Sequence, residues 1–477
     1  MLKKIAVITK FDWFKNSAWG LVSNILQNLL FSIFFIIIAR VYTENEFGKY
    51  VIANTIYSFV MGFSSLGLGH WFVRELINSE NKEKITQSFL KIQGLIGFFF
   101  YFLNVIISFL LYDDILIRNI SLILGINIIF DNIINAVKSL NIANQEQRKT
   151  FKILTIEAAL KCGISLFLLA WEMNIILLSS ILIVLRLVTL NLFIKMGSSS
   201  EIQLSKIAKA NVPWSEIKDV ILKNWPFIII GSISIINWRI GNILVSKWLT
   251  IYDVAVYEIS YKLFSLAYLL PVVVSTTVYP MLIKANQSGF ENLKKLYHKI
   301  FFPYTIFGFL TFTFIFTFSE DIIPFLFGDK YQNISMYVNE MFLTILIFPT
   351  LFLQANVVLT LKLEKIDMIC NILSLVVNIL ICVIGLSQYK SLTVVNMGLF
   401  SSFLFFHAIQ DYILIKKKVT TIKHVASFYL LSFMSVLYFK FSSDQFGKYT
   451  IFILTWSTLA FILFMKRKNI AQFYTKN

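Results

Sequence analysis

Long apolar stretches alternate with short polar gaps along the whole chain. A helix needs about 20 mainly apolar residues to cross a bilayer, and only helices or closed barrels satisfy the backbone hydrogen bonds there. The stretches are continuously apolar, which indicates helices, so the sequence predicts an all-α polytopic membrane protein with 14 transmembrane helices. The predicted spans are Trp19–Ala39, Tyr50–His70, Ile92–Tyr112, Asn119–Ser139, Phe151–Trp171, Asn174–Ile194, Trp225–Trp248, Val254–Ile283, Ile300–Ser319, Tyr337–Leu361, Met368–Ser387, Leu392–Ile415, Val425–Lys440 and Tyr449–Met465.

The basic residues predict the orientation of these spans. Most of the 43 Lys and Arg residues lie in every second gap between spans, at the borders of those gaps, or in the two termini. Lys138, at the end of the fourth predicted span, is counted with the gap that follows it. Cytoplasmic loops of membrane proteins carry such an excess. We therefore expect both termini in the cytoplasm. The opposite gaps and their borders hold only Arg40, Lys49, Arg118, Lys247, Lys330, Lys390, Lys440 and Lys448.

Composition agrees with a membrane protein and narrows the function. Hydrophobic residues make up 57% of the chain, charged residues 14%, and the mean hydropathy is +0.74, which excludes an ordinary soluble domain. Basic loops beside anionic lipids account for the net charge of +17, so no nucleic acid is expected. The three cysteines lie in spans without CxxC spacing, and no nucleophile, metal site or phosphate loop stands out. We expect neither an enzyme nor a cofactor.

The chain contains an internal repeat. An offset of 207 residues places the segment from Arg40 to Tyr50 on the segment from Lys247 to Tyr257, with Thr43 matching Thr250. Both segments join an outgoing span to a returning one, which is typical of transporters built from parallel repeats. The predicted organisation is an N-terminal lobe of six spans (1–194), a cytoplasmic amphipathic linker (195–224), a C-terminal lobe of six spans (225–415), and two extra spans with a tail (416–477).

A set of short motifs, in this order and spacing, carries a family resemblance over essentially the whole chain. They are Arg40 with Glu46-Phe-Gly-Lys-Tyr50, Ser64-Ser-Leu-Gly-Leu-Gly, Arg74-Glu75, Asp253-Val-Ala-Val-Tyr257, Tyr261-Lys-Leu, Tyr279-Pro280 and Phe327-Gly-Asp-Lys-Tyr331. The chain resembles Wzx-type O-antigen flippases, in the polysaccharide-transporter family of the MOP superfamily. The resemblance implies V-shaped lobes around a cavity, similar to those of MATE transporters.

The same resemblance implies an activity and partners. It implies alternating-access flipping of undecaprenyl-diphosphate-linked oligosaccharide, such as an O-antigen or capsule repeat unit, from the cytoplasmic to the outer leaflet. It also implies a place in the bacterial cytoplasmic (inner) membrane, alongside a polysaccharide polymerase and the initiating glycosyltransferase.

Ionisable residues inside spans are the candidate site residues, because they are costly in lipid and usually face a wet cavity. Arg239 is the leading candidate for contacting phosphate, since guanidinium binds phosphate bidentately and Arg239 is predicted to be unpaired, with no carboxylate at helical spacing. Arg186 is the next candidate. Lys161 and Lys262 are candidates too, but Glu157 and Glu258 precede them by four residues and could pair with them. Arg40 is a candidate at the outer mouth.

Polar stripes at helical spacing mark the predicted lining of the cavity. The residues are Asn24, Gln27, Asn28, Asn242, Glu258 and Tyr261. Asp131 and Glu157 are candidates for coupling to a cation gradient, although Asp131 could instead bond with Asn127, Asn132 and Asn135.

Three further features carry open expectations. His407 and Asp411 lie one turn apart, where a paired interfacial role is favoured over a proton relay. Pro271 and Pro349 lie inside long spans and should kink them.

Two alternatives share the fold. A MOP-superfamily multidrug or cation antiporter would rely on buried carboxylates, whereas the arginines here predict an anionic substrate. A lipid II flippase would share the carrier lipid.

Overall fold

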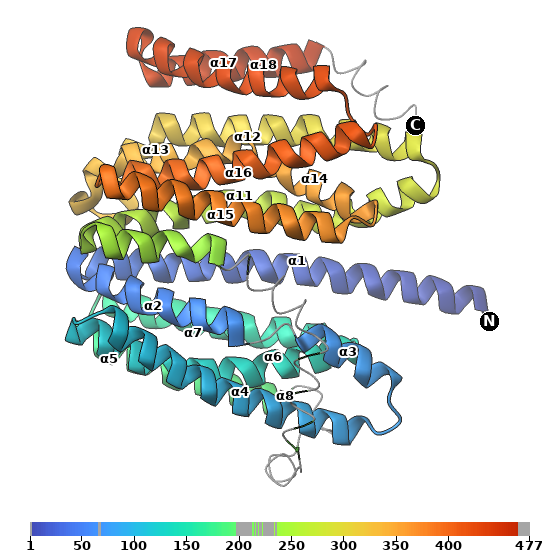
Figure 1. Ribbon diagram of the computed structural model, residues 1–477, viewed down its shortest axis with the longest axis vertical. Coiled ribbons are helices and arrows are strands. Elements are labelled where there is room, and N and C mark those ends of the chain that lie inside the picture. Colours follow the sequence, from blue (N-terminus) through green and yellow to red (C-terminus); the bar gives the residue numbers. More distant parts are fainter. Residues whose placement is uncertain are drawn as a thin grey trace. The chain divides into compact units, whose positions relative to one another are not determined.

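The protein is helical throughout the part that the structure describes (Figure 1). The computed structural model describes residues 2–64, 68–196 and 236–465, with a few single positions between 212 and 233, and no strand occurs among them. The all-α membrane class is confirmed. The predicted linker and the first half of the seventh predicted span lie largely outside these residues.

Ten segments of the described residues are long and apolar enough to cross a membrane. Each overlaps one predicted span, and the thirteenth prediction, the weakest by length, coincides with the segment Ile422–Phe446. The second, fifth, seventh and fourteenth predictions are not among the ten, so the count of 14 stays a prediction.

The chain divides into two compact units, 1–258 and 259–477, and the division falls inside one long helix. A helical segment, 236–248, belongs to the first unit. It is followed by α11 (Ile251–Gln287), which begins in the first unit and continues into the second. The other helices of the first unit are α1 (Leu2–Val41), α2 (Glu44–Ser64), α3 (Leu68–Asn78), α4 (Lys82–Leu111), α5 (Ile115–Gly125), α6 (Asn127–Ala143), α7 (Gln147–Leu168) and α8 (Ile175–Met196).

The first unit is held together by long helices packed along one another, α1 on α7 and α4 on α6. Its apolar core includes the rings of Phe72 (α3) and Phe89 (α4), which stack with centroids 4.1 Å apart, and the fully buried Phe193 of α8. The contact between α1 and α7 includes a polar pair, Ser23 Oγ and Thr155 Oγ1, which are 2.8 Å apart. Burial of these faces against one another leaves polar groups of α6, α7 and α8 inside the unit.

The second unit comprises the rest of α11 and the helices after it. They are α12 (Phe290–Phe327), the 3₁₀ turn η1 (Asp329–Ile334), α13 (Ser335–Phe342), the 3₁₀ turn η2 (Leu343–Leu346), α14 (Phe348–Thr360), α15 (Glu364–Gln388), α16 (Leu392–Lys416), α17 (Ile422–Phe446) and α18 (Lys448–Met465). α15 packs along α16, and α12 packs against α13, η2 and α14.

The tenth predicted span is broken differently from the prediction. Pro349 lies in the first turn of α14, where its missing N–H costs nothing, and the 3₁₀ turn η2 separates α14 from α13. Gly308 of α12 accommodates this break, because a Cβ there would lie 2.7 Å from the carbonyl oxygen of Ile345. Pro271 does lie inside its helix, α11, as predicted.

The aligned repeat segments make the same local contacts. At the start of α2, the Thr43 hydroxyl donates to Glu46 Oε2 (2.8 Å), and the Glu46 N–H donates back to Thr43 Oγ1 (3.2 Å). At the start of α11, Thr250 and Asp253 repeat both bonds, at 2.6 and 3.2 Å. These are reciprocal capping boxes, which satisfy helix N–H groups that would otherwise be orphaned.

Candidate functional site

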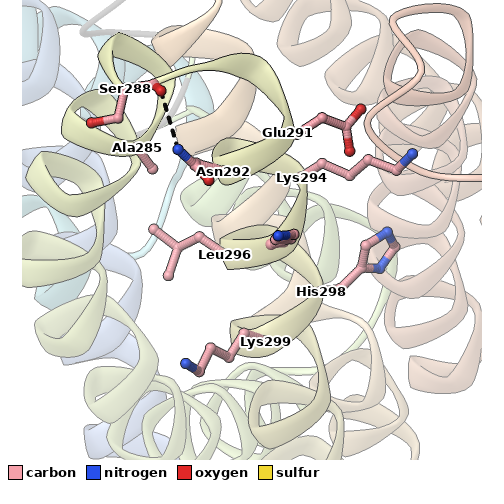
Figure 2. Close-up of a pocket in the computed structure, with 9 residues that line it drawn as sticks. Ala285, Ser288, Glu291, Asn292, Lys294, Leu296, His298 and Lys299 are labelled. Carbon is pink, nitrogen blue, oxygen red and sulfur yellow. Dashed lines mark hydrogen bonds between the residues drawn. The ribbon is translucent and has the colours of Figure 1, made fainter. Parts of the chain in front are cut away.

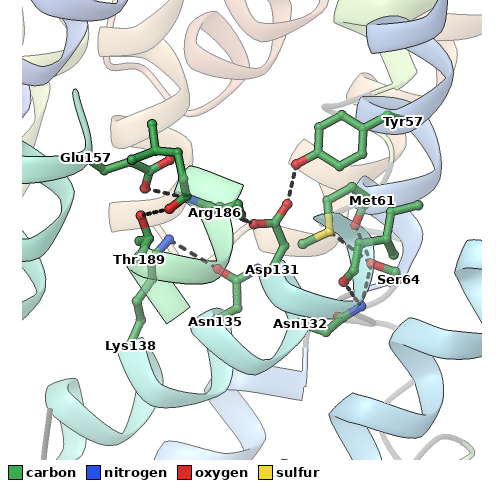
Figure 3. Close-up of polar contacts among 12 residues, drawn as sticks. Tyr57, Met61, Ser64, Asp131, Asn132, Asn135, Lys138, Glu157, Arg186 and Thr189 are labelled. Atoms are coloured by element: carbon green, nitrogen blue, oxygen red, sulfur yellow. Dashed lines mark hydrogen bonds and ion pairs between the residues drawn. The ribbon is translucent and has the colours of Figure 1, made fainter. Parts of the chain in front are cut away.

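An arginine held between two carboxylates forms the centre of the candidate site (Figure 3). Arg186 of α8 donates from Nε to Asp131 Oδ1 of α6 at 2.5 Å, and from Nη1 to Glu157 Oε2 of α7 at 2.5 Å. The side chains of Asp131 and Glu157 are only 4% and 1% exposed, and that of Arg186 is 16% exposed. Three helices therefore meet at one charge-paired group in the predicted membrane region.

Further polar groups extend this centre. Tyr57 of α2 donates its hydroxyl to Asp131 Oδ2, and Lys161 Nζ lies 2.9 Å from Glu157 Oε1. Lys138 of α6 donates to Asn135 Oδ1 at 3.3 Å and lies close enough to interact electrostatically with Arg186 and both carboxylates. The cluster carries three cations and two carboxylates, so its formal charge is positive.

A cavity of about 320 Å³ opens beside this cluster within the first unit. Its polar wall combines amides and hydroxyls with both lysines, Arg186 and Glu157, and Phe31, Leu124, Leu154 and Leu182 supply an apolar wall. The polar lining residues are Gln27, Tyr50, Asn54, Tyr57, Asn127, Lys138, Glu157, Lys161 and Arg186. A mixed wall with a few convergent charges is typical of a ligand site.

Several predicted contacts are corrected here. Arg186, the second candidate, has two carboxylate partners, and both come from other helices. Asp131 pairs with Arg186 and Tyr57 rather than with its neighbouring asparagines. The predicted pairing of Lys161 with Glu157 is confirmed.

Arg239 is also paired, contrary to the prediction. Its Nη1 lies 3.2 Å from Glu258 Oε1, and Asn242 Nδ2 donates to Glu258 Oε2 at 2.6 Å. Glu258 is only 6% exposed, and its charge is compensated by this arginine from the helical segment 236–248. Lys262 and Tyr261 lie half-buried on α11, in the second unit.

The predicted stripe of α1 divides between the cavity and the surface. Gln27 is buried, lines the cavity and donates to Ser23 Oγ at 2.8 Å. Asn24 is exposed and accepts a hydrogen bond from Asn28 Nδ2 at 2.6 Å, and neither lines this cavity. Arg40 is exposed in the last turn of α1.

The sequence reasoning missed Lys138 and Tyr57. Lys138 was assigned to the cytoplasmic charges, but it lines the cavity from inside α6. A signal for it existed: Asp131, Asn135 and Lys138 are spaced i, i+4 and i+7, which places them on one helix face. No comparable spacing pointed to Tyr57, whose partner lies 74 residues away.

A second buried polar network lies in the other unit. Asp411 Oδ2 accepts from Tyr429 Oη at 2.9 Å and lies 2.9 Å from His407 Nδ1, and its Oδ1 accepts from Gln354 at 2.7 Å. The pairing of His407 with Asp411 is confirmed, and His407 is fully buried within this unit, while its interfacial depth in the membrane stays a prediction. Tyr429 belongs to α17, so this network attaches an extra C-terminal helix to α14 and α16.

Comparisons with known proteins place the chain in a family. The model of a polysaccharide biosynthesis protein family matches residues 37–336. The chain belongs to this family. No curated protein matches the sequence.

Solved structures of MOP-superfamily transporters share its fold. The lipid II flippase MurJ in an inward closed conformation has a TM-score of 0.72 at 17% identity, covering 94% of this chain and 99% of that one. An inward-facing MATE-family multidrug transporter has a TM-score of 0.68 at 12% identity, covering 82% and 94%. A MOP-superfamily transporter from Pyrococcus furiosus has a TM-score of 0.56 at 12% identity, covering 84% and 94%. The chain is therefore a multi-pass membrane protein of the polysaccharide biosynthesis family with the fold of these transporters.

Proposed function

We propose that this member of the polysaccharide biosynthesis family flips an undecaprenyl-diphosphate-linked oligosaccharide from the cytoplasmic to the outer leaflet by alternating access. The observation that carries the proposal is the cavity of the first unit, with three cations against two carboxylates. A diphosphate crossing a low-dielectric layer needs compensating positive charge, because burying an unpaired charge is costly. The surplus cation of this cavity supplies it.

The three cations have different roles in this proposal. Arg186 already binds Asp131 and Glu157, so it joins the three helices. It contributes positive electrostatic potential to the cavity rather than a guanidinium that binds the phosphate. Lys138 and Lys161 are half-buried, line the cavity and provide flexible ammonium donors to phosphate oxygens. Arg239, Lys262 and Arg40 stay secondary candidates along the path.

The volume of the cavity fits part of the substrate. Ligand sites usually occupy about 300 to 1,000 Å³, and this cavity, at about 320 Å³, suits the phosphate groups rather than a whole oligosaccharide. The polyprenyl tail stays in lipid. We place the protein in the bacterial inner membrane with both termini cytoplasmic, beside a polymerase and an initiating glycosyltransferase.

A multidrug or cation antiporter is the second candidate, and one observation favours it. Asp131 and Glu157 are buried carboxylates in the same cavity region, the kind of group that binds or exchanges cations in membranes. A lipid II flippase remains an alternative within the anionic-substrate class, since it would move the same diphosphate carrier.

The deciding experiment reconstitutes the protein in liposomes with undecaprenyl-diphosphate oligosaccharide and follows access of an added glycosidase to the sugar. We expect faster access than in empty liposomes and a clear slowing in Lys138→Gln/Lys161→Gln. The matched control is Lys149→Gln/Lys152→Gln, which removes two lysines of α7 that do not line the cavity. Absence of flipping, combined with uptake of a cationic dye against a proton or sodium gradient, would support the antiporter instead.

A further inference from the structure

The buried polar network of the second unit contains a closed triangle of polar atoms. His407 and Asp411 belong to α16, and Tyr429 belongs to α17. His407 Nδ1 lies 2.7 Å from Tyr429 Oη and 2.9 Å from Asp411 Oδ2, and Tyr429 Oη lies 2.9 Å from the same carboxylate oxygen. The side chains of His407 and Asp411 are only 0% and 4% exposed, so the atoms of the triangle must satisfy one another.

The other side of the imidazole determines which of its nitrogens carries the hydrogen. His407 Nε2 lies 3.0 Å from Thr350 Oγ1, and the Thr350 hydroxyl donates its single hydrogen to the carbonyl oxygen of Ile347 at 2.8 Å. Thr350 Oγ1 can then only accept, so His407 Nε2 donates to it. A neutral imidazole has one N–H, and this bond therefore leaves Nδ1 without a hydrogen.

The triangle is consequently short of one hydrogen. With His407 neutral and Asp411 ionised, the hydroxyl of Tyr429 brings the single hydrogen of the three atoms. If Tyr429 donates it to Asp411, Nδ1 faces two oxygens with a lone pair only, and if it donates to Nδ1, the carboxylate oxygen is left facing two acceptors. Buried acceptors at hydrogen-bond distance without a hydrogen between them are costly. One added proton on Nδ1 completes the triangle.

The groups around the triangle favour this added proton. Tyr297 of α12 and His424 of α17 lie close enough to Asp411 to interact with it electrostatically. α14 has no ionisable residue and contributes Gln354, which donates to Asp411 Oδ1 at 2.7 Å. Asp367 of α15 accepts a hydrogen bond at 3.1 Å from the residue that precedes Asp411. A carboxylate beside a base favours the charged form of that base.

A pocket lies near this network, where α11 ends and α12 begins (Figure 2). Its volume is about 600 Å³, and His298 is among its lining residues. The rings of His298 and His424 are in contact, with centroids 4.7 Å apart. The charge pattern assigns this end of α12 to the cytoplasm. Protons from the cytoplasmic side can therefore approach the triangle through the pocket and these two half-buried histidines.

We propose that the triangle of His407, Asp411 and Tyr429 is a proton-binding site, with the bound proton on His407 Nδ1. Imidazole is ordinarily a stronger base than a carboxylate, so the proton resides on the histidine rather than on Asp411. The proton is taken from water on the cytoplasmic side and is returned there when the site empties. This site is independent of the substrate that the first unit binds.

The test is an infrared titration of the full-length protein in nanodiscs, with isotope-labelled histidine so that imidazole and imidazolium signals can be separated. The pH runs from about 5 to 8, the range in which histidine ordinarily titrates. His407→Gln identifies the part of the signal that comes from His407. Asp411→Asn removes the carboxylate charge at nearly constant size. The matched control is Asp321→Asn, which breaks a similar bond at 2.6 Å from Tyr449 of α18 to Asp321 of α12.

We expect part of the imidazolium signal to disappear in His407→Gln. In Asp411→Asn the proton affinity of His407 should fall about tenfold or more, because an opposite charge beside the imidazolium is lost, and Asp321→Asn should leave it unchanged. Tyr429→Phe keeps the imidazole and the carboxylate and should keep the signal, which tests the site even if Asp411→Asn does not fold. An imidazolium signal unaltered by His407→Gln, equal effects of the two aspartate substitutions, or loss of the signal in Tyr429→Phe would overturn the proposal.

Discussion

At the scale of single residues, the main finding is that the membrane-embedded arginines are paired across helices. Arg186 compensates two nearly inaccessible carboxylates. Removing one partner of a buried ion pair is far more damaging than replacing the whole pair, because the remaining charge is left without compensation. The stability of the first unit should therefore depend strongly on this side chain.

Arg186→Gln is expected to lower the free energy of unfolding by about 3–5 kcal/mol. Denaturant unfolding of the detergent-purified protein measures the change. Arg118→Gln is the control: Arg118 pairs with Asp113, whose side chain is fully exposed, and donates to the carbonyl oxygens of Tyr112 and Phe109. We expect a smaller loss there than at Arg186, because no carboxylate is left buried without a partner. A loss at Arg186 no larger than that of the control would contradict the role assigned to the pairing.

Asp114, in the turn between α4 and α5, gives a prediction about pH. Burial alone would raise its pKa, but the hydrogen bond and charge of Lys49 and the N–H groups of Ile117 and Leu116 outweigh burial and lower the pKa below 3.8. A carboxyl group with a lowered pKa stabilises the folded state above its unfolded pKa and loses this contribution as pH falls through the folded pKa.

The effect of Asp114→Asn on thermal stability should therefore be constant above about pH 5 and disappear as the pH falls below 3.8. Its size is up to about 1 kcal/mol, as expected for a partly exposed pair. Unfolding temperatures of wild type and variant, measured across this range, test the expectation. A difference that grows on acidification would show the opposite sign.

At the scale of helices, Gly308 allows α12 to approach the backbone of η2. A Cβ at this position would lie 2.7 Å from one carbonyl oxygen and 3.2 Å from the next, and backbone atoms cannot rotate away. Gly163 of α7 has nothing within 4 Å of the same added atom. Substitution of Gly163 therefore tests helix propensity alone, and substitution of Gly308 tests close packing as well.

Gly308→Ala is expected to destabilise the protein by about 1–3 kcal/mol through overpacking. Gly163→Ala should be neutral or stabilising by up to about 1 kcal/mol, because alanine is the better helix former. Denaturant unfolding of both variants under the same conditions gives the comparison. Equal effects at the two sites would mean that α12 and η2 do not pack as closely as described.

The helices were predictable because apolar periodicity and span length are local properties of the sequence. The caps of α2 and α11 were not predicted, although the repeat aligned Thr43 with Thr250, and each threonine is followed three residues later by an acid, Glu46 or Asp253. The break before α14 was not visible, because a proline inside an apolar run looks the same whether it kinks a helix or begins one.

At the scale of the whole molecule, the arrangement of charges could be predicted only where partners are close in sequence. Glu157 and Lys161 are four residues apart, and their pairing was predicted. Arg186 is 55 residues from Asp131 and 29 from Glu157, so nothing in the local pattern joined them. The relevant information is the packing of α6, α7 and α8, which a single sequence does not display.

The orientation in the membrane is a prediction at this scale. A fluorescent reporter fused after Asn477 should be active in the cytoplasm. Alkaline phosphatase is active only outside the cytoplasm. It should be active when fused at Gly447, in the turn between α17 and α18, because each of these helices is predicted to cross the bilayer. If a phosphatase fused after Asn477 were active as well, the C-terminus would lie outside and one span would be removed.

The surplus cation of the first cavity has an electrical consequence. The empty cluster has a formal charge of one positive unit, from three cations and two carboxylates, and a bound diphosphate with two negative charges would make it one negative unit. Because the cell interior is negative, the membrane potential would favour outward movement of the negatively charged loaded site. It would also favour the inward return of the positively charged empty site. Each unit charge is worth about 2.3 kcal/mol per 100 mV.

Turnover in liposomes should therefore accelerate under a potassium diffusion potential, negative on the side where the substrate is loaded, and slow when the potential is reversed. Lys138→Gln/Lys161→Gln, with a negatively charged empty cluster, should lose the voltage-assisted return. Such a carrier would be energised by the resting potential of the cell even where no ion travels with its cargo.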